Sequence, residues 1–251
     1  MSVSPLGGSL LRSGKNSPPN LLLRLGANIF LAGALSIPFS VLSAILAYYF
    51  LVELLRLPLA VVIGLAPLYY LVAKWCFKLF FLVLARAQLK PVEEGHFEAD
   101  FGNKNVRNWL INISLVDAVK YFVGNPPLGQ TFLRPPLYRF LGAKLGKATS
   151  LDDVTDPYLL EMEDGAVAGG RSFIVTHISR NGGLYLKKVK IGRNALVGIC
   201  STIMPGVEIG EGAVVAANSL IPMDTKIPPY TLWSGIPAKQ VKSLKGEVED
   251  R

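Results

Sequence analysis

Cysteine, histidine and charged residues are all scarce in this chain of 251 residues. The two cysteines, Cys76 and Cys200, lie far apart and form no spacing motif, so neither a disulfide nor a cysteine metal site is expected. The two histidines, His96 and His177, are too few for a zinc site built from three histidines, and we expect no metal. Charged residues make up only 18% of the chain, which is low for a soluble globular protein.

The charge that is present is mostly basic, and the formal net charge is +8. The lysines and arginines are scattered, and no reading helix or base-stacking surface accompanies them, so we expect no nucleic-acid partner. Basic residues that flank membrane segments account for the excess more simply.

Hydrophobic residues make up 51% of the chain and are concentrated in its first third. Residues 25–52 form an uncharged run that is long enough to span a bilayer with some tilt. A short connection containing Glu53 and Arg56 leads to a second apolar run that continues to residue 85. The sequence therefore predicts a two-helix transmembrane hairpin over residues 25–86, preceded by a flexible basic N-terminus at residues 1–24.

Basic residues flank both ends of the predicted hairpin. Arg12, Lys15 and Arg24 precede it without any acidic residue, and Arg86 and Lys90 follow it. Because lysine and arginine favour the cytoplasmic side, we expect a multi-pass membrane protein whose C-terminal domain lies in the cytoplasm and which contacts membrane lipid.

Two lysines interrupt the second apolar run. Lys74 and Lys78 are four residues apart and share one helical face. Their side chains either extend to the membrane interface or form a basic ledge for the anionic headgroup of a lipid or substrate. The sequence leaves both interpretations open.

A linker over residues 87–140 follows the hairpin. Within it, residues 104–124 carry apolar side chains at helical spacing, which predicts an amphipathic helix on the membrane surface or against the next domain. The apolar positions are Val106, Trp109, Leu110, Ile113, Val116, Val119 and Phe122. Diproline pairs at 126–127 and 135–136 interrupt the passage to that domain.

A six-residue repeat begins at Ile191 and continues for eight units. The first position of each unit is Ile191, Val197, Ile203, Ile209, Val215, Ile221, Ile227 and Trp233. The second position is mostly small, with Gly192, Gly198, Gly210 and Ala216. This pattern predicts a triangular parallel β-coil in which the β-branched residues point inward and the small residues form tight or left-handed corners.

The repeat and its closing stretch at residues 227–241 resemble the hexapeptide-repeat acyltransferases. The resemblance extends over residues 141–241, and it implies a left-handed parallel β-helix domain there, followed by a polar tail at residues 242–251. It also implies acyl-CoA, with acetyl-CoA first among the candidates, as co-substrate in a groove between the subunits of a homotrimer. The positions it points to are Gly198, Ala216 and Ser234 for the wall of the groove and Lys239 for a phosphate contact.

Two positions depart from the family pattern. Pro222-Met223 replaces a frequent Thr-Lys pair, which removes one expected phosphate contact. Leu196 stands where many members have tryptophan, so the acceptor pocket is less well defined by the resemblance.

His177 is the candidate catalytic residue. In the maltose- and xenobiotic-type acetyltransferases, which this segment resembles, a catalytic histidine likewise precedes a looped-out segment and a Val-x-Ile-Gly restart, here residues 189–192. An imidazole titrates near neutral pH and can take the proton from an attacking hydroxyl or amine. We expect the oxyanion donor near Gly198 and Ile199. His96 has no comparable surroundings and is given no role.

The carboxylate that orients His177 stays open at the level of sequence. The candidates in the preceding coils are Asp152, Asp153, Asp156, Glu161, Glu163 and Asp164.

The sequence thus favours a membrane-anchored acyltransferase acting on a hydroxyl or amine of a small molecule, a glycan, a lipid-linked molecule or a peptide. One alternative is a non-catalytic, membrane-tethered trimeric scaffold. Another is a peptide-synthetase-associated domain, because the order of segments is similar to the C-terminal membrane region of polylysine-synthetase-type nonribosomal peptide synthetases. A γ-type carbonic anhydrase is excluded by the single histidine of the repeat region. A sugar nucleotidyltransferase is disfavoured because its N-terminal Gly-rich phosphate loop is missing.

Overall fold

The structure, a computed structural model, describes residues 21–54, 56, 58–98, 100–123, 134–180 and 182–244. It contains two compact units. One unit combines residues Pro91–Trp109 with Pro126–Arg251, and the other combines Pro19–Lys90 with Leu110–Asn125. The basic residues Arg12 and Lys15, the 126–127 diproline pair and most of the predicted tail lie outside the described residues.

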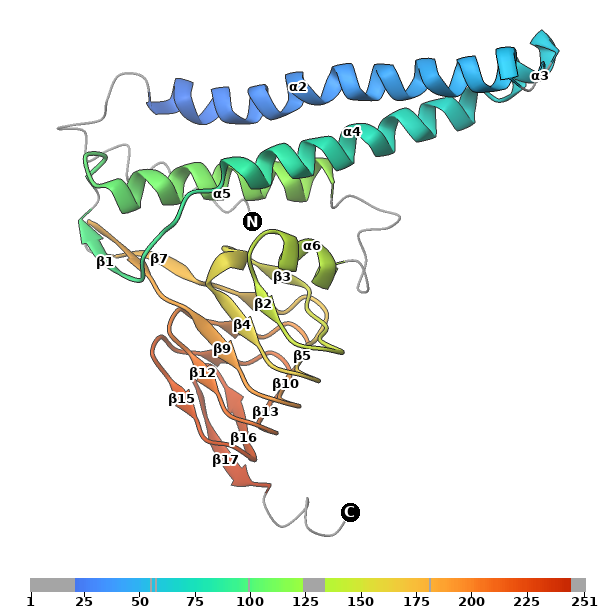
Figure 1. Cartoon of the computed structure of the whole chain (residues 1–251). Helices are drawn as coiled ribbons and strands as arrows, with labels where there is room; N and C mark the ends of the chain where they lie inside the picture. Colours follow the sequence, from blue (N-terminus) through green and yellow to red (C-terminus); the bar gives the residue numbers. More distant parts are fainter. Residues whose placement is uncertain are drawn as a thin grey trace. The chain divides into compact units, whose positions relative to one another are not determined.

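The first unit is dominated by three sheets of short strands, which form the three faces of a coil (Figure 1). The first face contains β2 (Lys144–Leu145), β4 (Leu160–Met162), β9 (Val189–Ile191), β12 (Glu208–Ile209) and β15 (Lys226–Ile227). The second face contains β5 (Val167–Ala168), β10 (Leu196–Val197), β13 (Val214–Val215), β16 (Thr231–Gly235) and β17 (Ala238–Ser243). The third face contains β3 (Asp153–Val154), β6 (Phe173–Ile174), β11 (Thr202–Ile203) and β14 (Leu220–Ile221). All neighbours pair in parallel except β16 and β17, which form a closing antiparallel hairpin.

The hexads set the register between coils. Val197 pairs with Val215, and Ile203 pairs with Ile221, so each residue stands beside the one 18 positions, or three hexads, further along. The first-position Ile and Val side chains are buried inside the coil, where removal of apolar surface from water stabilises the fold. The β-rich hexapeptide-repeat fold predicted from the sequence is confirmed.

The corners of the coil differ from the expectation in one respect. Left-handed backbone angles recur at the fourth position of successive hexads, at Asn194, Cys200, Gly206, Gly212, Asn218, Asp224 and Tyr230. The second-position glycines serve a different purpose. A Cβ on Gly210 would lie 2.5 Å from the backbone nitrogen of Pro229 in the next coil. These positions are small because adjacent coils approach closely there, and not because the chain turns left-handed.

The regular coil is interrupted after the third face of its second turn. Glu161 and Lys190 are paired neighbours on the first face although they are 29 residues apart, so eleven residues beyond the 18-residue repeat are looped out. Strands β7 (His177–Arg180) and β8 (Gly183–Leu186) form an antiparallel hairpin within this segment. Strand β1 (Gly95–Glu98) of the linker pairs with β8, which gives a three-stranded sheet.

The remaining elements are helical. They are α2 (Leu21–Tyr49), the π-helix η1 (Phe50–Leu54), α3 (Leu59–Gly64), α4 (Ala66–Gln88), α5 (Lys104–Phe122), α6 (Arg134–Phe140) and the short 3-10 helix η2 (Pro157–Leu159). In the second unit α2 packs against α4, and Phe39 stacks on Phe80 with ring centroids 4.0 Å apart. By length and composition, the helical segments Gly26–Glu53 and Ala66–Gln88 could each cross a membrane.

Helix α5 is less strictly amphipathic than the apolar spacing predicts, because its buried positions include two asparagines. The amide of Asn108 donates to the carbonyl of Pro91 at 2.8 Å. The side chain of Asn112 bonds both the N–H and the carbonyl of Lys90, each at 2.8 Å. These bonds replace water for the buried amides and tie the helix to the segment before β1.

The close approach of the coils predicts which glycines tolerate a side chain. Gly210→Ala should lower the free energy of unfolding by about 1–3 kcal/mol, because the added methyl overlaps the backbone at Pro229. Gly170→Ala is the matched control, since no atom lies within 4 Å of its added Cβ, and it should change stability by less than about 0.5 kcal/mol. Chemical denaturation of both variants checks this, and equal effects would contradict the stacking explanation.

Candidate active site

His177 lies at the start of β7, where the chain leaves the third face of the coil. Its Nδ1 is 2.5 Å from Oδ2 of Asp156. The histidine is only 3% exposed, and Asp156 is completely buried. Of the six carboxylates that the sequence left open, the structure brings Asp156 to His177.

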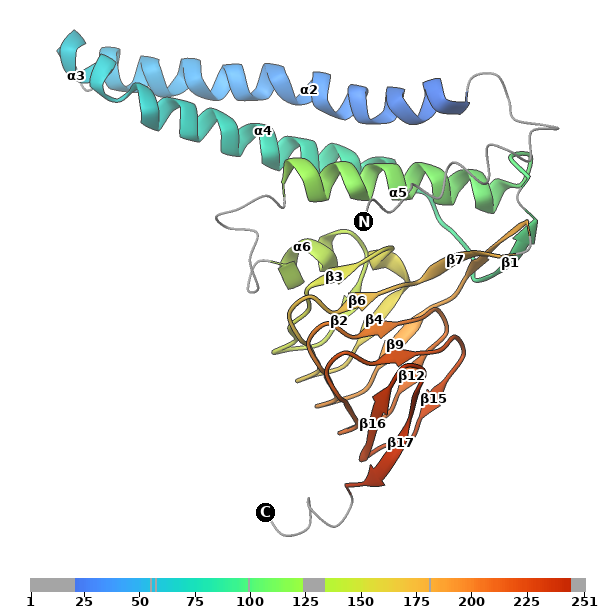
Figure 2. The ribbon, with the colours of Figure 1, turned by 180° about the vertical axis from the view of Figure 1, so that it is seen from behind.

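Strand register explains why these two residues meet. Val154 of β3 pairs with Ile174 of β6, and Figure 2 shows these strands side by side on the third face. Thr155 and Asp156 leave β3 at the same end at which Thr176 and His177 follow β6. The register between these strands is 20 residues and not the 18 of the later coils, so extrapolating the repeat would not have identified Asp156.

Three side chains donate hydrogen bonds to Asp156. Besides His177, the hydroxyl of Tyr158 donates to Oδ1 and the hydroxyl of Thr176 donates to Oδ2, both at 2.9 Å. Burial raises the pKa of Asp156, but the charge of His177 and these hydrogen bonds outweigh it, so that the net effect lowers the pKa. Asp156 therefore stays an ionised carboxylate, which only accepts hydrogen bonds.

The ionised Asp156 determines the tautomer of His177. Since the carboxylate has no proton to give, Nδ1 carries the N–H and Nε2 carries the free lone pair. Within the described part of the chain, no residue hydrogen-bonds to Nε2. An imidazole held in this state can accept a proton at Nε2 from a bound nucleophile.

Trp109 of α5 packs against the ring of His177. The two rings meet edge to face at 68°, with their centroids 4.9 Å apart. Trp109 is 1% exposed, and its buried indole N–H has no hydrogen-bond partner among the described residues. The sequence identified Trp109 only as an apolar helix position and gave no signal of this contact.

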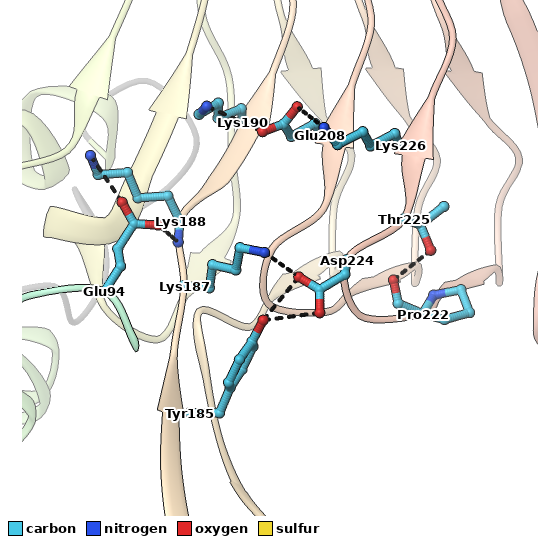
Figure 3. A network of polar contacts seen from close by, with 10 residues as sticks. All are labelled: Glu94, Tyr185, Lys187, Lys188, Lys190, Glu208, Pro222, Asp224, Thr225 and Lys226. Carbon is cyan, nitrogen blue, oxygen red and sulfur yellow. Dashed lines mark hydrogen bonds and ion pairs between the residues drawn. The ribbon is translucent and has the colours of Figure 1, made fainter. Parts of the chain in front are cut away.

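A polar cluster anchors the hairpin that carries His177 to the rest of the coil (Figure 3). Strand β8 contributes Tyr185, whose hydroxyl is 2.9 Å from both carboxylate oxygens of Asp224. Nζ of Lys187 lies 2.5 Å from Oδ1 of the same aspartate. This hydrogen bond from Lys187 contributes most to lowering the pKa of Asp224. Lys188 pairs with Glu94, which precedes β1, at 3.3 Å.

The predicted cofactor-binding residues gather at another edge of the coil, where the second face ends. Gly198 and Ala216 follow β10 and β13, and Ser234 belongs to β16, so the three stack on successive coils. Lys239 of β17 is the ladder partner of Ser234. Gly169, which the sequence analysis missed, occupies the same position one coil earlier, since its amide donates to the carbonyl of Val197.

The expected oxyanion donor needs correction. The amide of Gly198 donates to the carbonyl of Val215 at 2.8 Å, so this N–H is occupied within the coil and is not free for a substrate. Of the two amides in the predicted region, the one at Ile199 is the remaining candidate.

The first face carries a groove of about 750 Å³, which does not include His177 among its lining residues. Charges of opposite sign alternate along it at Lys144, Glu161, Lys190, Glu208 and Lys226. Figure 3 shows Glu208 between Lys190 and Lys226, at 3.2 and 3.8 Å. Exposed pairs of this kind contribute little to stability.

The described residues contain no group of three or more His, Cys, Asp or Glu side chains that could hold a metal ion. His96 of β1 lies against Gly183, where an added Cβ would be 2.5 Å from Nε2 of the imidazole. Both cysteines are free thiols.

Comparison with known proteins identifies the class. Residues 188–222 match the family described as bacterial transferase hexapeptide (six repeats). A putative acetyltransferase, YvoF, of Bacillus subtilis (strain 168) is 33% identical over 121 residues, which cover 46% of this chain and 69% of YvoF. Galactoside O-acetyltransferase of Escherichia coli (strain K12) is 26% identical over 132 residues, covering 48% of this chain and 62% of that enzyme.

Among solved structures, a galactoside acetyltransferase in complex with coenzyme A superposes with a TM-score of 0.47 at 17% identity, covering 59% of this chain and 88% of that one. The relationship to YvoF covers more than two thirds of that protein. The chain therefore belongs to the hexapeptide-repeat acyltransferase family, and it is an acyltransferase.

Proposed function

We propose that this enzyme transfers an acetyl or other acyl group from acyl-CoA to a hydroxyl or amine, with His177 as the general base. The observation that carries this proposal is the buried pair of His177 and Asp156, with Nδ1 fixed by the carboxylate and Nε2 without a partner among the described residues. The names of the relatives, a putative acetyltransferase and a galactoside O-acetyltransferase, support acetyl as the first choice of acyl group.

The chemistry follows from the state of the imidazole. The acceptor oxygen or nitrogen attacks the thioester carbonyl while Nε2 of His177 takes its proton. Collapse of the tetrahedral intermediate breaks the carbon–sulfur bond, and the proton on Nε2 passes to the departing CoA sulfur. Asp156 stabilises the imidazolium through the Nδ1 hydrogen bond and stays ionised throughout. No covalent acyl-enzyme is required if donor and acceptor are held together.

Acyl-CoA is proposed to lie along the edge lined by Gly198, Ala216 and Ser234, with Lys239 near a phosphate. Support comes from the stacking of these residues on successive coils and from the exposed position of Lys239 beside Ser234. His177 follows a strand of the third face, whereas this edge ends the second face. A homotrimer in which the groove of one copy faces His177 of the next would unite them.

The chain is further proposed to be a membrane-anchored, multi-pass protein with the coil domain in the cytoplasm. Support comes from the two candidate spans and from large apolar side chains on α2 and α4 that are exposed in the protein, such as Phe30 at 75%. The acceptor would then be a glycan, lipid-linked molecule or peptide at the membrane surface.

His177→Ala should lower kcat by about 10²- to 10⁴-fold, because the attacking group loses its general base. Binding of acyl-CoA, measured by isothermal titration calorimetry, should change little. His96→Ala removes the only other histidine and should retain activity.

A His177→Ala enzyme with undiminished transfer would remove the general-base assignment. If neither this variant nor the parent protein binds acyl-CoA, the non-catalytic scaffold becomes the better description.

Ala216→Leu and Lys239→Ala should each raise the Kd for acyl-CoA by about tenfold, which corresponds to about 1.4 kcal/mol of lost binding. The first places a bulky side chain in the proposed groove, and the second removes the proposed phosphate contact. Lys226→Ala, a charge removal on the first face, is the control and should leave Kd unchanged. Unaltered binding in both groove variants, or a monomer by size measurement in mild detergent, would contradict the shared groove.

Membrane anchoring predicts that the full chain stays in the membrane fraction after washing with alkaline carbonate. A membrane-impermeant maleimide should label the exposed Cys200 in inverted vesicles and not in intact cells, because a cytoplasmic coil domain is accessible only from that side. A Cys200→Ser variant controls for labelling elsewhere. Release by carbonate would argue against the anchor.

A further inference from the structure

The contact between Trp109 and His177 has no role in the chemistry described so far. Trp109 belongs to α5, which lies outside the repeat, yet its ring lies 4.9 Å from the imidazole, centroid to centroid. Both residues belong to the same compact unit, and both are almost fully buried. The contact is therefore part of the environment in which His177 would work.

The hydrogen bond to Asp156 alone does not fix the imidazole plane. The Cβ–Cγ bond and the hydrogen bond at Nδ1 hold one side of the ring, and the opposite side, which carries Nε2, can still tilt unless a neighbouring side chain packs against the ring. A second contact on the ring removes this freedom, and Trp109 supplies one at an interplanar angle of 68°. Edge-to-face packing of this kind is a favoured arrangement for aromatic rings.

The other neighbours of His177 do not hold the ring in this way. Among the described residues, Asp156 is the ionisable group in direct contact with His177, and it is bonded in turn to Tyr158. Strand β8 opposes His177 with Leu186, and α5 contributes Trp109. Trp109 is thus the aromatic side chain that packs on the imidazole.

We propose that Trp109 is a positioning residue for His177, which fixes the imidazole plane during acyl transfer. This inference rests on the proposed role of His177 as the general base. It makes the linker helix, and not the repeat alone, part of the catalytic apparatus.

The test compares Trp109→Leu with Trp109→Phe in the full-length protein. Trp109→Leu keeps an apolar side chain but removes the aromatic ring, so kcat should fall by about 10- to 100-fold while KM for acyl-CoA stays constant. Trp109→Phe keeps an aromatic ring against the imidazole and should retain most of kcat.

Val106→Ala is the matched control for helix packing. Val106 lies three residues earlier on α5 and is fully buried, so Val106→Ala should lower Tm while kcat stays near that of the parent. A fall in kcat for Val106→Ala equal to that for Trp109→Leu would assign the effect to general loosening of α5 and overturn the proposal. So would a Trp109→Leu enzyme with the parent kcat, or a Trp109→Phe enzyme as impaired as Trp109→Leu.

The result for His177→Ala separates this inference from the proposed function. If His177→Ala is inactive while Trp109→Leu behaves like the parent, only the role of Trp109 is wrong. If His177→Ala is fully active, the general base itself is misassigned and the positioning role falls with it.

Discussion

Close stacking of backbone on backbone is the constraint on which the coil domain depends. Each short strand pairs with the strands of the coils before and after it, 18 residues away in the later coils, and the second-position glycines let these coils approach within hydrogen-bonding distance. The inward Ile and Val side chains add the apolar burial that makes the stack stable. Because each coil contacts only its neighbours, a disturbance of the repeat at one point leaves the coils beyond it in register.

Because each coil depends only on its neighbours, the repeat can accommodate the inserted segment that carries His177. The eleven extra residues between β6 and β9 leave the regular ladder and would expose unpaired backbone if they had no partner of their own. They pair instead as β7 and β8, and β1 from the linker pairs with β8. Asp224, at a corner between later coils, holds Tyr185 and Lys187 of the hairpin. The inserted segment thus has a regular hydrogen-bonded structure of its own, and it places His177 against Asp156 without disturbing Ile191 and the coils that follow.

The sequence predicted the features that follow from the six-residue repeat, and it missed those that arise where the chain departs from the repeat. The hexads from Ile191 onward specified the parallel coil, because a period of six with inward β-branched residues has few other solutions. Asp156 was one of six candidates, because β3 and β6 pair with a 20-residue register that cannot be read from the 18-residue period of the later hexads. Trp109 was one apolar position among seven, because a contact between a linker helix and a loop insertion leaves no local signal. The sequence also predicted small residues at the second position of the hexads, but for the wrong physical reason. They are small because adjacent coils approach closely there, and the left-handed backbone angles lie at the fourth position instead.

The division of the proposed site between two edges has a consequence for assembly. A strand of the third face leads into His177, whereas Gly198, Ala216 and Ser234 line the edge at which the second face ends. The edges of a triangular coil cannot move onto one another, because the hydrogen-bonded strands of the three faces fix their relative positions. A single copy therefore holds the base and the proposed groove apart, and only a neighbouring copy could bring a groove to His177. Closed three-fold symmetry satisfies this requirement for every copy at once, with three equivalent sites and none left incomplete. On this argument an assembly of copies, such as the proposed trimer, is a condition of the proposed chemistry, and the support proposed for Trp109 comes from the same copy as His177.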